Sequence, residues 1–350
     1  MSADSKISVG VLGCGRIAQL AHLNALVGNP LVNVAALADA DAGRRDQAAD
    51  FAPNAAQCSD YSEVLSSKEI DAVVICLPPA LHARVAIEAF AAGKHVYLEK
   101  PVAIDLVEAE EVCRAWRASG KAGMIGFNFR FNRLYLEARE HLKWGTLGQV
   151  VAARSVFSAA ARPLPKWKRS RRTGGGVLLD LASHHADIAR FLFDEDIAAV
   201  RATILSQRCE GDTALVEVHT LSGIPIQSFF SMSAIEEHSF SIYGQKGRLS
   251  FDRLSPNVQI TRPMQPYDKV RRVWDSFAAL RLKRLLRDPS EPSFAASLDA
   301  FVRSVRDDRQ VKPDLEDGYR SLAVIAAAEK SLETGTFVEL AQFTSVAVQS

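Results

Sequence analysis

The sequence predicts an α/β protein: an N-terminal doubly wound parallel sheet, followed by an α+β domain with an open, mostly antiparallel sheet. In the first third of the chain, short β-branched runs alternate with helical patterns, as in βαβ units. Beyond residue 125, strand-like runs follow one another through turns with few helices between them, which favours antiparallel pairing. The chain has 350 residues, enough for two domains, which we place at residues 1–125 and 126–350.

The elements of the first domain follow from where its apolar runs begin and end. We expect strands at Ile7–Leu12, Val32–Ala38, Ala72–Leu77, His95–Leu98 and Ala122–Gly126. Helical apolar spacing covers Ile17–Val27, Arg44–Phe51, Leu81–Ala92 and Leu106–Ser119. Gly93 and Gly120 follow the last two helices, where a glycine ends a helix without steric cost.

The second domain is read in the same way. Strand-like runs cover Leu147–Ser158, Ala198–Gln207, Ala214–Leu221, Ile226–Met232, Phe240–Tyr243 and Arg248–Phe251. Helical spacing covers Phe294–Arg306 and Gly318–Thr334 near the end of the chain. The least structured segment is expected at Ala161–Thr173.

Composition excludes several classes of protein. With 48% hydrophobic residues, 24% charged residues and a net charge of +1, the chain is neither disordered nor a general nucleic-acid binder. Five cysteines without a Cys-x-x-Cys pair favour reduced thiols over a disulfide framework or a zinc site, and we expect no metal. No secretory signal or run long enough to span a bilayer is visible, so we expect a cytoplasmic protein.

The segment after the first expected strand reads Gly13-Cys-Gly15-Arg16-Ile17-Ala18, a G-x-G-x-x-A pattern that leaves a strand and opens a helix. Gly13 permits the tight turn, Gly15 lets the backbone approach a pyrophosphate, and the small Ala18 allows close helix–strand packing. Amides at the start of the helix, at Arg16 and Ile17, then face the phosphates. A purely structural glycine turn is the alternative, and the context favours a Rossmann dinucleotide-binding domain.

Asp39 ends the second expected strand, 24 residues after Gly15, where an acid can accept both hydroxyls of the adenosine ribose. Its charge repels a 2′-phosphate, so we expect NAD as the preferred cofactor. Arg44 and its neighbour Arg45 partly offset that repulsion, which leaves NADP possible.

Two further segments lie at the carboxyl ends of expected parallel strands, where open α/β sheets bind their ligands. The first is Leu77-Pro78-Pro-Ala-Leu-His82, and the second is Glu99-Lys100-Pro. A partly desolvated Lys100 beside a cationic nicotinamide ring is a plausible proton donor or alkoxide stabiliser. A surface lysine that precedes a helix is the alternative.

Three glycines precede a helix on which Asp180, His184 and Asp187 share one face at i, i+4 and i+7. Asp180 can orient His184, and a histidine suits abstraction of a hydroxyl proton at neutral pH. A hydrogen-bonded structural pair or two metal ligands are the alternatives for this pattern. His185 points about 100° away around the helix, and we interpret it as structural.

Taken in chain order, these motifs resemble the Gfo/Idh/MocA oxidoreductase family of glucose–fructose oxidoreductase and inositol dehydrogenase over residues 6–340. The resemblance implies that Lys100, Asp180 and His184 form the catalytic set. It also implies further roles: Leu77, Pro78 and His82 line the cofactor, Glu99 lies by the nicotinamide ribose, and Asn128 and Arg130 border the active site. Family members place a tryptophan and a basic residue at the positions of Trp167 and Lys168, and they assemble as dimers or tetramers.

The expected reaction is reversible oxidation of a secondary alcohol on a sugar, cyclitol or sugar derivative by NAD(P). Two alternatives stay open. One is glycoside cleavage through transient oxidation, as in NAD-dependent glycosidases, and the other is a non-catalytic regulator that senses the dinucleotide. Retention of a lysine, an aspartate and a histidine at the catalytic positions argues against the regulator.

Charge is unevenly distributed between the two domains. Residues 1–125 hold 15 acidic and 11 basic residues, whereas residues 126–350 hold 26 acidic and 31 basic residues. The excess is concentrated at 166–172, with five basic residues in seven, and at 269–287, which reads as a basic amphipathic helix. From this we predict an anionic substrate such as a nucleotide sugar, sugar phosphate or uronate, and charge on a solvated surface is the alternative. Membrane-surface binding by residues 269–287 is the less favoured alternative to packing on the protein itself.

Overall fold

The computed structural model describes residues 6–253, 255–262 and 291–344. Packing divides the chain into two compact units. The first comprises Met1–Phe131, Arg172–Gly175 and Glu291–Ala323, and the second comprises Asn132–Arg171, Gly176–Ser290 and Val324–Ser350. The first unit thus includes residues 291–323, which follow the expected boundary by more than 150 positions. The division of function at residues 125 and 126 stays a prediction.

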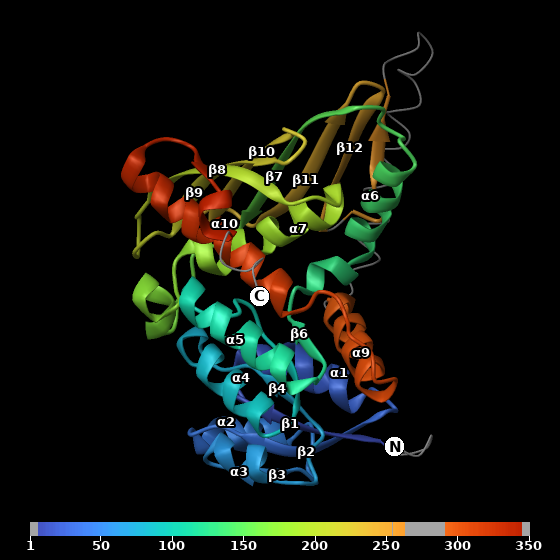
Figure 1. Ribbon diagram of the computed structural model, residues 1–350, viewed down its shortest axis with the longest axis vertical. Coiled ribbons are helices and arrows are strands. Elements are labelled where there is room, and N and C mark those ends of the chain that lie inside the picture. The colour runs from blue at the N-terminus through green and yellow to red at the C-terminus, as the bar shows by residue number, and fades with distance from the viewer. Residues whose placement is uncertain (1–5, 254, 263–290, 345–350) are drawn as a thin grey trace. The chain divides into compact units, whose positions relative to one another are not determined.

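The first unit contains a six-stranded parallel sheet in the order β3-β2-β1-β4-β5-β6 (Figure 1). Its strands are β1 (Ile7–Leu12), β2 (Val32–Ala38), β3 (Ala56–Cys58), β4 (Ala72–Ile75), β5 (His95–Leu98) and β6 (Gly123–Ile125). Strand β1 pairs with β2 on one side and with β4 on the other, so the strand order reverses at β1. The predicted doubly wound sheet is confirmed, and its ligand-binding switch point lies at the carboxyl ends of β1 and β4.

Helices connect these strands in sequence. They are α1 (Leu23–Val27), α2 (Ala42–Ala49), α3 (Tyr61–Ser66), α4 (His82–Ala91) and α5 (Leu106–Ser119), and a π-helical turn, η1 (Ala18–His22), precedes α1. The Asp105 carboxylate caps α5 by accepting a hydrogen bond from the backbone N–H of Glu108. Gly93 and Gly120 have φ values of 73° and 64°, which confirms their prediction as helix-ending glycines.

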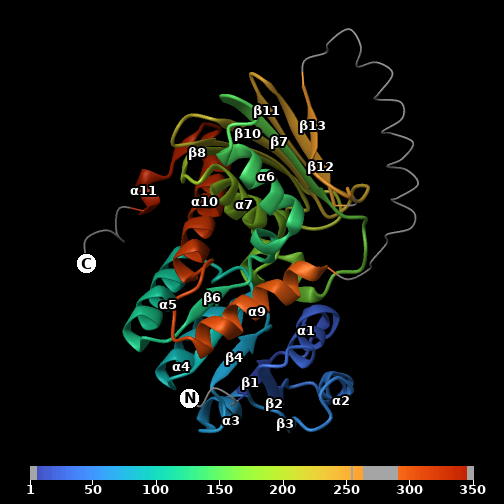
Figure 2. The same cartoon turned by 90° about the vertical axis from the view of Figure 1, so that its right-hand side faces the viewer.

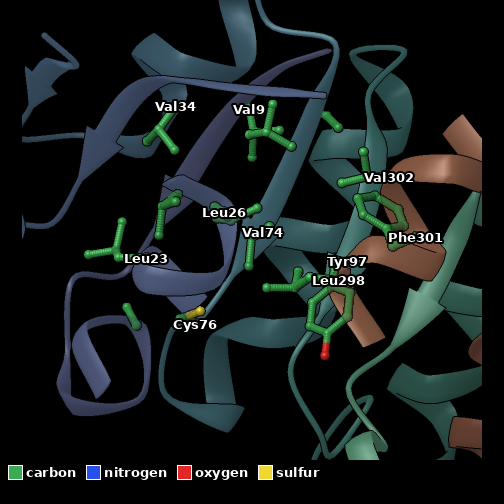
Figure 3. Packing of buried hydrophobic residues seen from close by; sticks show 14 of the residues in the cluster. Val9, Leu23, Leu26, Val34, Val74, Cys76, Tyr97, Leu298, Phe301 and Val302 are labelled. Atoms are coloured by element: carbon green, nitrogen blue, oxygen red, sulfur yellow. The ribbon is translucent and has the colours of Figure 1, made fainter. Parts of the chain in front are cut away.

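The core of the first unit is an apolar cluster in which the sheet meets α1 and α9 (Pro292–Arg306) (Figure 3). Its labelled members from the sheet and α1 are Val9, Val34, Val74, Tyr97, Leu23 and Leu26. Leu298, Phe301 and Val302 of α9 belong to the same cluster, and each is 1% exposed. Complete burial of such a side chain contributes roughly 1.5–3 kcal/mol, so a helix from the last fifth of the chain helps to hold the N-terminal sheet.

The second unit contains an eight-stranded sheet in the order β13-β12-β11-β7-β10-β9-β8-β14. The strands are β7 (Val150–Ser158), β8 (Ile197–Leu205), β9 (Thr213–Thr220), β10 (Pro225–Ser231), β11 (Glu237–Gly244), β12 (Gly247–Asp252), β13 (Gln259–Thr261) and β14 (Val338–Glu339). Strands β7 and β10 pair in parallel, and the other neighbours pair antiparallel. The mostly antiparallel sheet predicted for this part of the chain is confirmed.

Helices α6 (Arg133–Lys143), α7 (Ser183–Phe193), α10 (Leu315–Thr334) and α11 (Ala341–Thr344) accompany these strands. Ala186 of α7 and Val324 and Ala328 of α10 line a small internal cavity together with Val216 and Phe230 of the sheet. Figure 2 shows α7 and α10 against the strands of this sheet. This packing fixes the helix that carries His184. No helix in the described residues is long and apolar enough to cross a bilayer, and the basic segment 269–287 lies outside those residues.

Candidate active site

The glycine turn after β1 has the geometry that a dinucleotide requires. Gly13 has a φ of +93°, and a Cβ there would lie 2.7 Å from the carbonyl oxygen of Cys76, so the position is restricted to glycine. A Cβ on Gly15 would meet no atom of the described chain within 4 Å, which leaves open space above the turn. Arg16 and Ile17 follow at the start of the η1 turn. The turn therefore fits a pyrophosphate at this position.

Asp39 follows β2 and lies beside that turn. Its Oδ2 accepts a hydrogen bond from the Cys14 N–H at 2.9 Å, and its Oδ1 accepts one from the Asp41 N–H at 2.9 Å. Arg44 approaches the carboxylate at 3.9 Å, and the Arg45 guanidinium donates to the Asp39 carbonyl at 2.5 Å. Backbone amides thus hold the carboxylate in a fixed orientation at the strand end where a ribose is expected, and two cations lie nearby.

The loop after β4 carries Leu77 and Pro78, and His82 begins α4. The two His82 ring nitrogens lie 2.6 Å from the Pro101 carbonyl oxygen and 2.8 Å from the Leu77 carbonyl oxygen. Burial lowers the pKa of this imidazole, although both carbonyls favour its charged form. His82 therefore links the loops after β4 and β5. Its predicted contact with the cofactor stays a prediction.

Glu99 and Lys100 follow β5. The Glu99 N–H donates to the Ile75 carbonyl at 3.0 Å, which continues the pairing of β5 with β4 by one residue. The Glu99 side chain is buried, and one of its oxygens lies 2.6 Å from Nε2 of His22. Lys100 is half-buried at the carboxyl end of the sheet. This position, beside the switch point of the sheet, suits a group that acts on a ligand.

Asn128 and Arg130 lie in the 3₁₀ turn η3 (Asn128–Phe131) that follows β6. The Asn128 amide donates to the Ser293 hydroxyl at 2.8 Å, and the Arg130 guanidinium pairs with Asp317 at 3.1 Å. These bonds tie the end of the sheet to α9 and to the start of α10. The roles that we predicted for Asn128 and Arg130 at the substrate are untested by this arrangement.

In the second unit, Asp180 lies within a π-helical turn, η6 (Leu178–Ala182), that leads into α7. Gly176, at φ +86°, starts this turn, and the Val177 N–H donates to the Gly211 carbonyl at 2.8 Å. Single π-helical turns are frequent at functional sites because they re-aim side chains. The regular i, i+4 spacing that we predicted for Asp180 and His184 is therefore replaced by a wider turn at Asp180.

Lys168 contacts Asp180 directly. Its ammonium lies 2.7 Å from Oδ2 of Asp180, and the two side chains are 21% and 16% exposed. The same ammonium lies 5.2 Å from the centroid of the Trp167 ring. The structure thus brings three of the predicted site residues together: a carboxylate, a lysine and an indole. The Lys168–Asp180 pairing was not predicted from the sequence, which gave no signal beyond the basic composition of the loop.

His184 and His185 are both buried, but they have different neighbours. The Phe157 ring lies edge-on to the His184 ring with centroids 6.1 Å apart. His185 Nδ1 lies 2.7 Å from the Ser155 hydroxyl of β7, and burial holds the His185 pKa well below its usual value. These contacts support the structural interpretation of His185. His184 remains the candidate for chemistry.

The predicted site residues are distributed over the two units. Gly13, Gly15, Arg16, Ile17, Asp39, Arg44, Leu77, Pro78, His82, Glu99, Lys100, Asn128 and Arg130 belong to the first, and Trp167, Lys168, Asp180 and His184 belong to the second. Within the described residues, no group of three or more histidine, cysteine or acidic side chains is arranged to hold a metal ion.

Comparison with known proteins agrees with the motifs. Residues 7–127 match the profile "Oxidoreductase family, NAD-binding Rossmann fold", and residues 139–340 match "Oxidoreductase family, C-terminal alpha/beta domain", both of the Gfo/Idh/MocA family. Inositol 2-dehydrogenase from Rhizobium meliloti (strain 1021) is 29% identical over 343 residues, which cover 93% of this chain and 97% of that protein.

Solved structures share the fold. A 3-ketoreductase from Actinomadura kijaniata in complex with NADP and TDP-benzene has a TM-score of 0.80 at 25% identity, and the match covers 93% of this chain and 98% of that one. Levoglucosan dehydrogenase in complex with NADH has a TM-score of 0.83 at 20% identity, covering 96% and 99%. The chain therefore belongs to the Gfo/Idh/MocA family of NAD(P)-dependent oxidoreductases, which act on CH–OH groups of sugars, cyclitols and nucleotide sugars.

Proposed function

We propose that this protein reversibly oxidises a secondary alcohol of a sugar, cyclitol or sugar derivative, with Lys100, Asp180 and His184 as its catalytic residues. The observation that carries the proposal is the segment formed by η6 and α7. Asp180 and His184 lie on consecutive turns of this segment, and the Lys168 ammonium lies 2.7 Å from the Asp180 carboxylate. A carboxylate and an imidazole held in this way suit proton transfer from a hydroxyl group.

The open glycine turn, Asp39 and Glu99 are the residues that would hold a nicotinamide dinucleotide, which when bound supplies the hydride acceptor. His184 accepts the proton of the substrate hydroxyl. Lys100 donates a hydrogen bond to the same oxygen and stabilises its developing negative charge. Asp180 orients the substrate or His184, and Lys168 keeps the Asp180 carboxylate in place. In the reverse direction, His184 returns the proton to the alkoxide oxygen.

NAD is the proposed preferred cofactor. The Asp39 carboxylate already accepts two backbone hydrogen bonds, and its remaining lone pairs are available for the two hydroxyls of an adenosine ribose. A 2′-phosphate would meet this negative charge. The guanidiniums of Arg44 and Arg45 reduce that repulsion, so we propose that NADP is bound more weakly rather than excluded.

The proposed substrate is anionic, and Trp167 and Lys168 are its proposed contacts. The Lys168 ammonium carries three N–H donors, and its bond to Asp180 uses one of them, so it can also bind a phosphate or carboxylate oxygen. The Trp167 ring offers a flat apolar surface for a sugar. Activity that is equal on neutral and acidic sugars, with no effect of salt on KM, would contradict this part of the proposal.

The proposed reaction is tested by measuring hydride transfer to the cofactor in the wild type and in variants that lack Lys100 or His184. A screen of inositols, sugar phosphates, uronates and nucleotide sugars for cofactor reduction identifies a substrate. Lys100→Ala and His184→Ala should each lower kcat by at least about 100-fold. Lys143→Ala and His219→Ala are matched controls because neither belongs to the predicted site; Lys143 is exposed on α6 and His219 is partly exposed on β9.

Two outcomes would overturn the proposal. Unchanged kcat in both site variants would remove the assignment of catalytic residues. Cleavage of a glycoside with catalytic NAD and no net reduction would replace the dehydrogenase reaction by transient oxidation.

We also propose a homodimer or homotetramer on the basis of the family resemblance, to be measured by light scattering coupled to size-exclusion chromatography.

A further inference from the structure

A buried histidine contacts the acidic residue of the Glu99-Lys100-Pro segment. His22 closes the η1 turn that follows the glycine motif, and its ring is completely buried. Its Nε2 lies 2.6 Å from Oε1 of Glu99, although 77 residues separate the two in sequence. The other carboxylate oxygen of Glu99 accepts a longer bond, 3.2 Å, from the Lys100 N–H. The His22 bond is therefore the shorter and stronger restraint on this carboxylate.

The surroundings of His22 define what its ring can do. The rings of Tyr97 and Phe294 stand edge-on to it, each with a centroid 5.5 Å away, and the Tyr97 hydroxyl contacts Ser297 instead. His22 Nδ1 is buried and meets no hydrogen-bond partner in the described part of the chain. A buried donor without an acceptor is more costly than an idle lone pair. The geometry therefore favours the tautomer in which Nε2–H donates to Glu99 and Nδ1 carries a lone pair.

The space around Glu99 is equally restricted. Gly126, which follows β6, lies against the carboxylate, and a Cβ at that position would stand 3.1 Å from Oε1. The Glu99 carboxylate is thus held by a rigid ring on one side and by backbone on the other. Among the residues that the structure describes, His22 is the only one whose side chain hydrogen-bonds to this carboxylate.

We propose that His22 is a positioning residue that fixes the Glu99 carboxylate, and through it the Glu99–Lys100 peptide, for cofactor binding. This inference rests on the proposed function, in which Glu99 lies by the nicotinamide ribose and Lys100 acts on the substrate oxygen. His22 itself touches neither. His22 links the helical turn that follows the glycine motif to the end of β5. The His22–Glu99 hydrogen bond therefore connects the segment proposed to bind the phosphates with the segment proposed to bind the nicotinamide ribose.

The test uses three substitutions near His22, together with Glu99→Gln alone and combined with His22→Phe, all in the full chain. His22→Phe keeps an aromatic ring between Tyr97 and Phe294 but cannot donate a hydrogen bond. His22→Gln keeps a donor that can reach Glu99. Tyr97→Phe is the matched control, because it removes a buried hydroxyl from the same cluster and leaves Glu99 untouched. Each variant is measured for the Kd of NADH by fluorescence, for thermal stability without cofactor, and for the pH profile of kcat.

We expect His22→Phe to weaken NADH binding by at least about tenfold, the effect of losing one charge-assisted hydrogen bond. His22→Gln should recover most of this loss, and Tyr97→Phe should bind NADH as the wild type does at a comparable loss of stability. Combining His22→Phe with Glu99→Gln should add little to Glu99→Gln alone, because both remove the same contact.

The possible results distinguish a failure of the positioning role of His22 from a failure of the proposed dehydrogenase function. Wild-type affinity and an unchanged pH profile in His22→Phe, while Glu99→Gln weakens binding, would overturn the positioning role and leave the proposed function intact. Equal loss of affinity in His22→Phe and Tyr97→Phe would also overturn it, since the effect would then be general destabilisation. Absence of NADH binding by the wild-type chain would overturn both.

Discussion

The stability of the second unit should depend on pH through His238. This residue of β11 stacks on Phe157, with ring centroids 4.4 Å apart and an angle of 10° between the rings, and its Nε2 lies 3.0 Å from the Tyr135 hydroxyl. Burial, and to a smaller extent the nearby charge of Arg253, lowers the His238 pKa from 6.5 to about 4. Phe157 also contacts His184, so the stack supports the proposed catalytic helix.

The sign and size of the effect follow from this pKa. Between pH 6.5 and about 4 the unfolded chain binds a proton at His238 that the folded chain does not, so the free energy of unfolding falls as the pH falls. The stabilisation is complete above pH 6.5 and is lost by about pH 4. The difference in pKa corresponds to about 3 kcal/mol at 1.36 kcal/mol for each pH unit. His185, whose pKa burial also lowers, acts in the same direction.

Urea unfolding at pH 7 and pH 4 measures this difference. His238→Phe keeps the stacked ring but does not titrate, so the change in unfolding free energy between the two pH values should shrink by up to about 3 kcal/mol relative to the wild type. His219→Phe, at a partly exposed histidine of β9, is the control and should leave the difference unchanged. The same pH dependence in wild type and His238→Phe would refute the reasoning, as would a His238 pKa near 6.5 by NMR titration.

Three further substitutions test the fold and the cofactor site. Gly13→Ala should weaken NADH binding and destabilise the first unit by at least about 1 kcal/mol, measured by titration and urea unfolding, because the φ of +93° and the Cys76 carbonyl at 2.7 Å exclude a Cβ. Asp39→Ser should raise kcat/KM with NADP relative to NAD by at least about tenfold, since a carboxylate no longer faces the 2′-phosphate. Phe301→Ala should lower the unfolding free energy by about 3–5 kcal/mol, whereas truncation of the exposed Leu20 should change it by less than about 0.5 kcal/mol.

Long apolar runs with clear ends were predicted well from the sequence. Ile7–Leu12, Val32–Ala38 and His95–Leu98 are strands with the bounds that we expected. Each is buried within a parallel sheet, so the run is continuous and stops where the chain turns. The right-handed crossover expected between parallel strands does not by itself give the strand order, which was not predicted and comes from the structure.

Short elements were missed for a physical reason. Strand β3 (Ala56–Cys58) has three residues and lies at the edge of the sheet, so it carries too few apolar positions to form a pattern. Helix α3 (Tyr61–Ser66) is also short, yet its start was readable: Asp60 and Glu63 form a capping box. This capping box would have predicted the helix, because it depends on two polar residues and not on the spacing of apolar residues.

Contacts between residues far apart in the sequence account for the parts of the candidate site that could not be predicted. Spacing along a helix indicates which side chains share a face, and it placed Asp180 near His184. It carries no information on partners from other elements, such as His22 beside Glu99 or Lys168 beside Asp180. The available signal for His22 was a histidine within the apolar run that follows the glycine turn. If such a position is buried, its polar side chain requires a buried partner.

Ion pairs with distant residues also change the charge that the basic loop 166–172 presents to an anionic substrate. Counting five basic residues in 166–172 treats each as an available cation, but Lys168 pairs with Asp180 and Arg171 pairs with Glu329. Each pair reduces the field that a substrate would meet, because the negative charge of the carboxylate offsets the charge of its cation at short range. The donors that remain on Lys168 therefore contribute to anion binding in addition to the reduced net charge of the loop. Binding should accordingly depend on the geometry of the substrate's anionic group, so anionic sugars of equal charge whose charged groups differ in position should differ in KM.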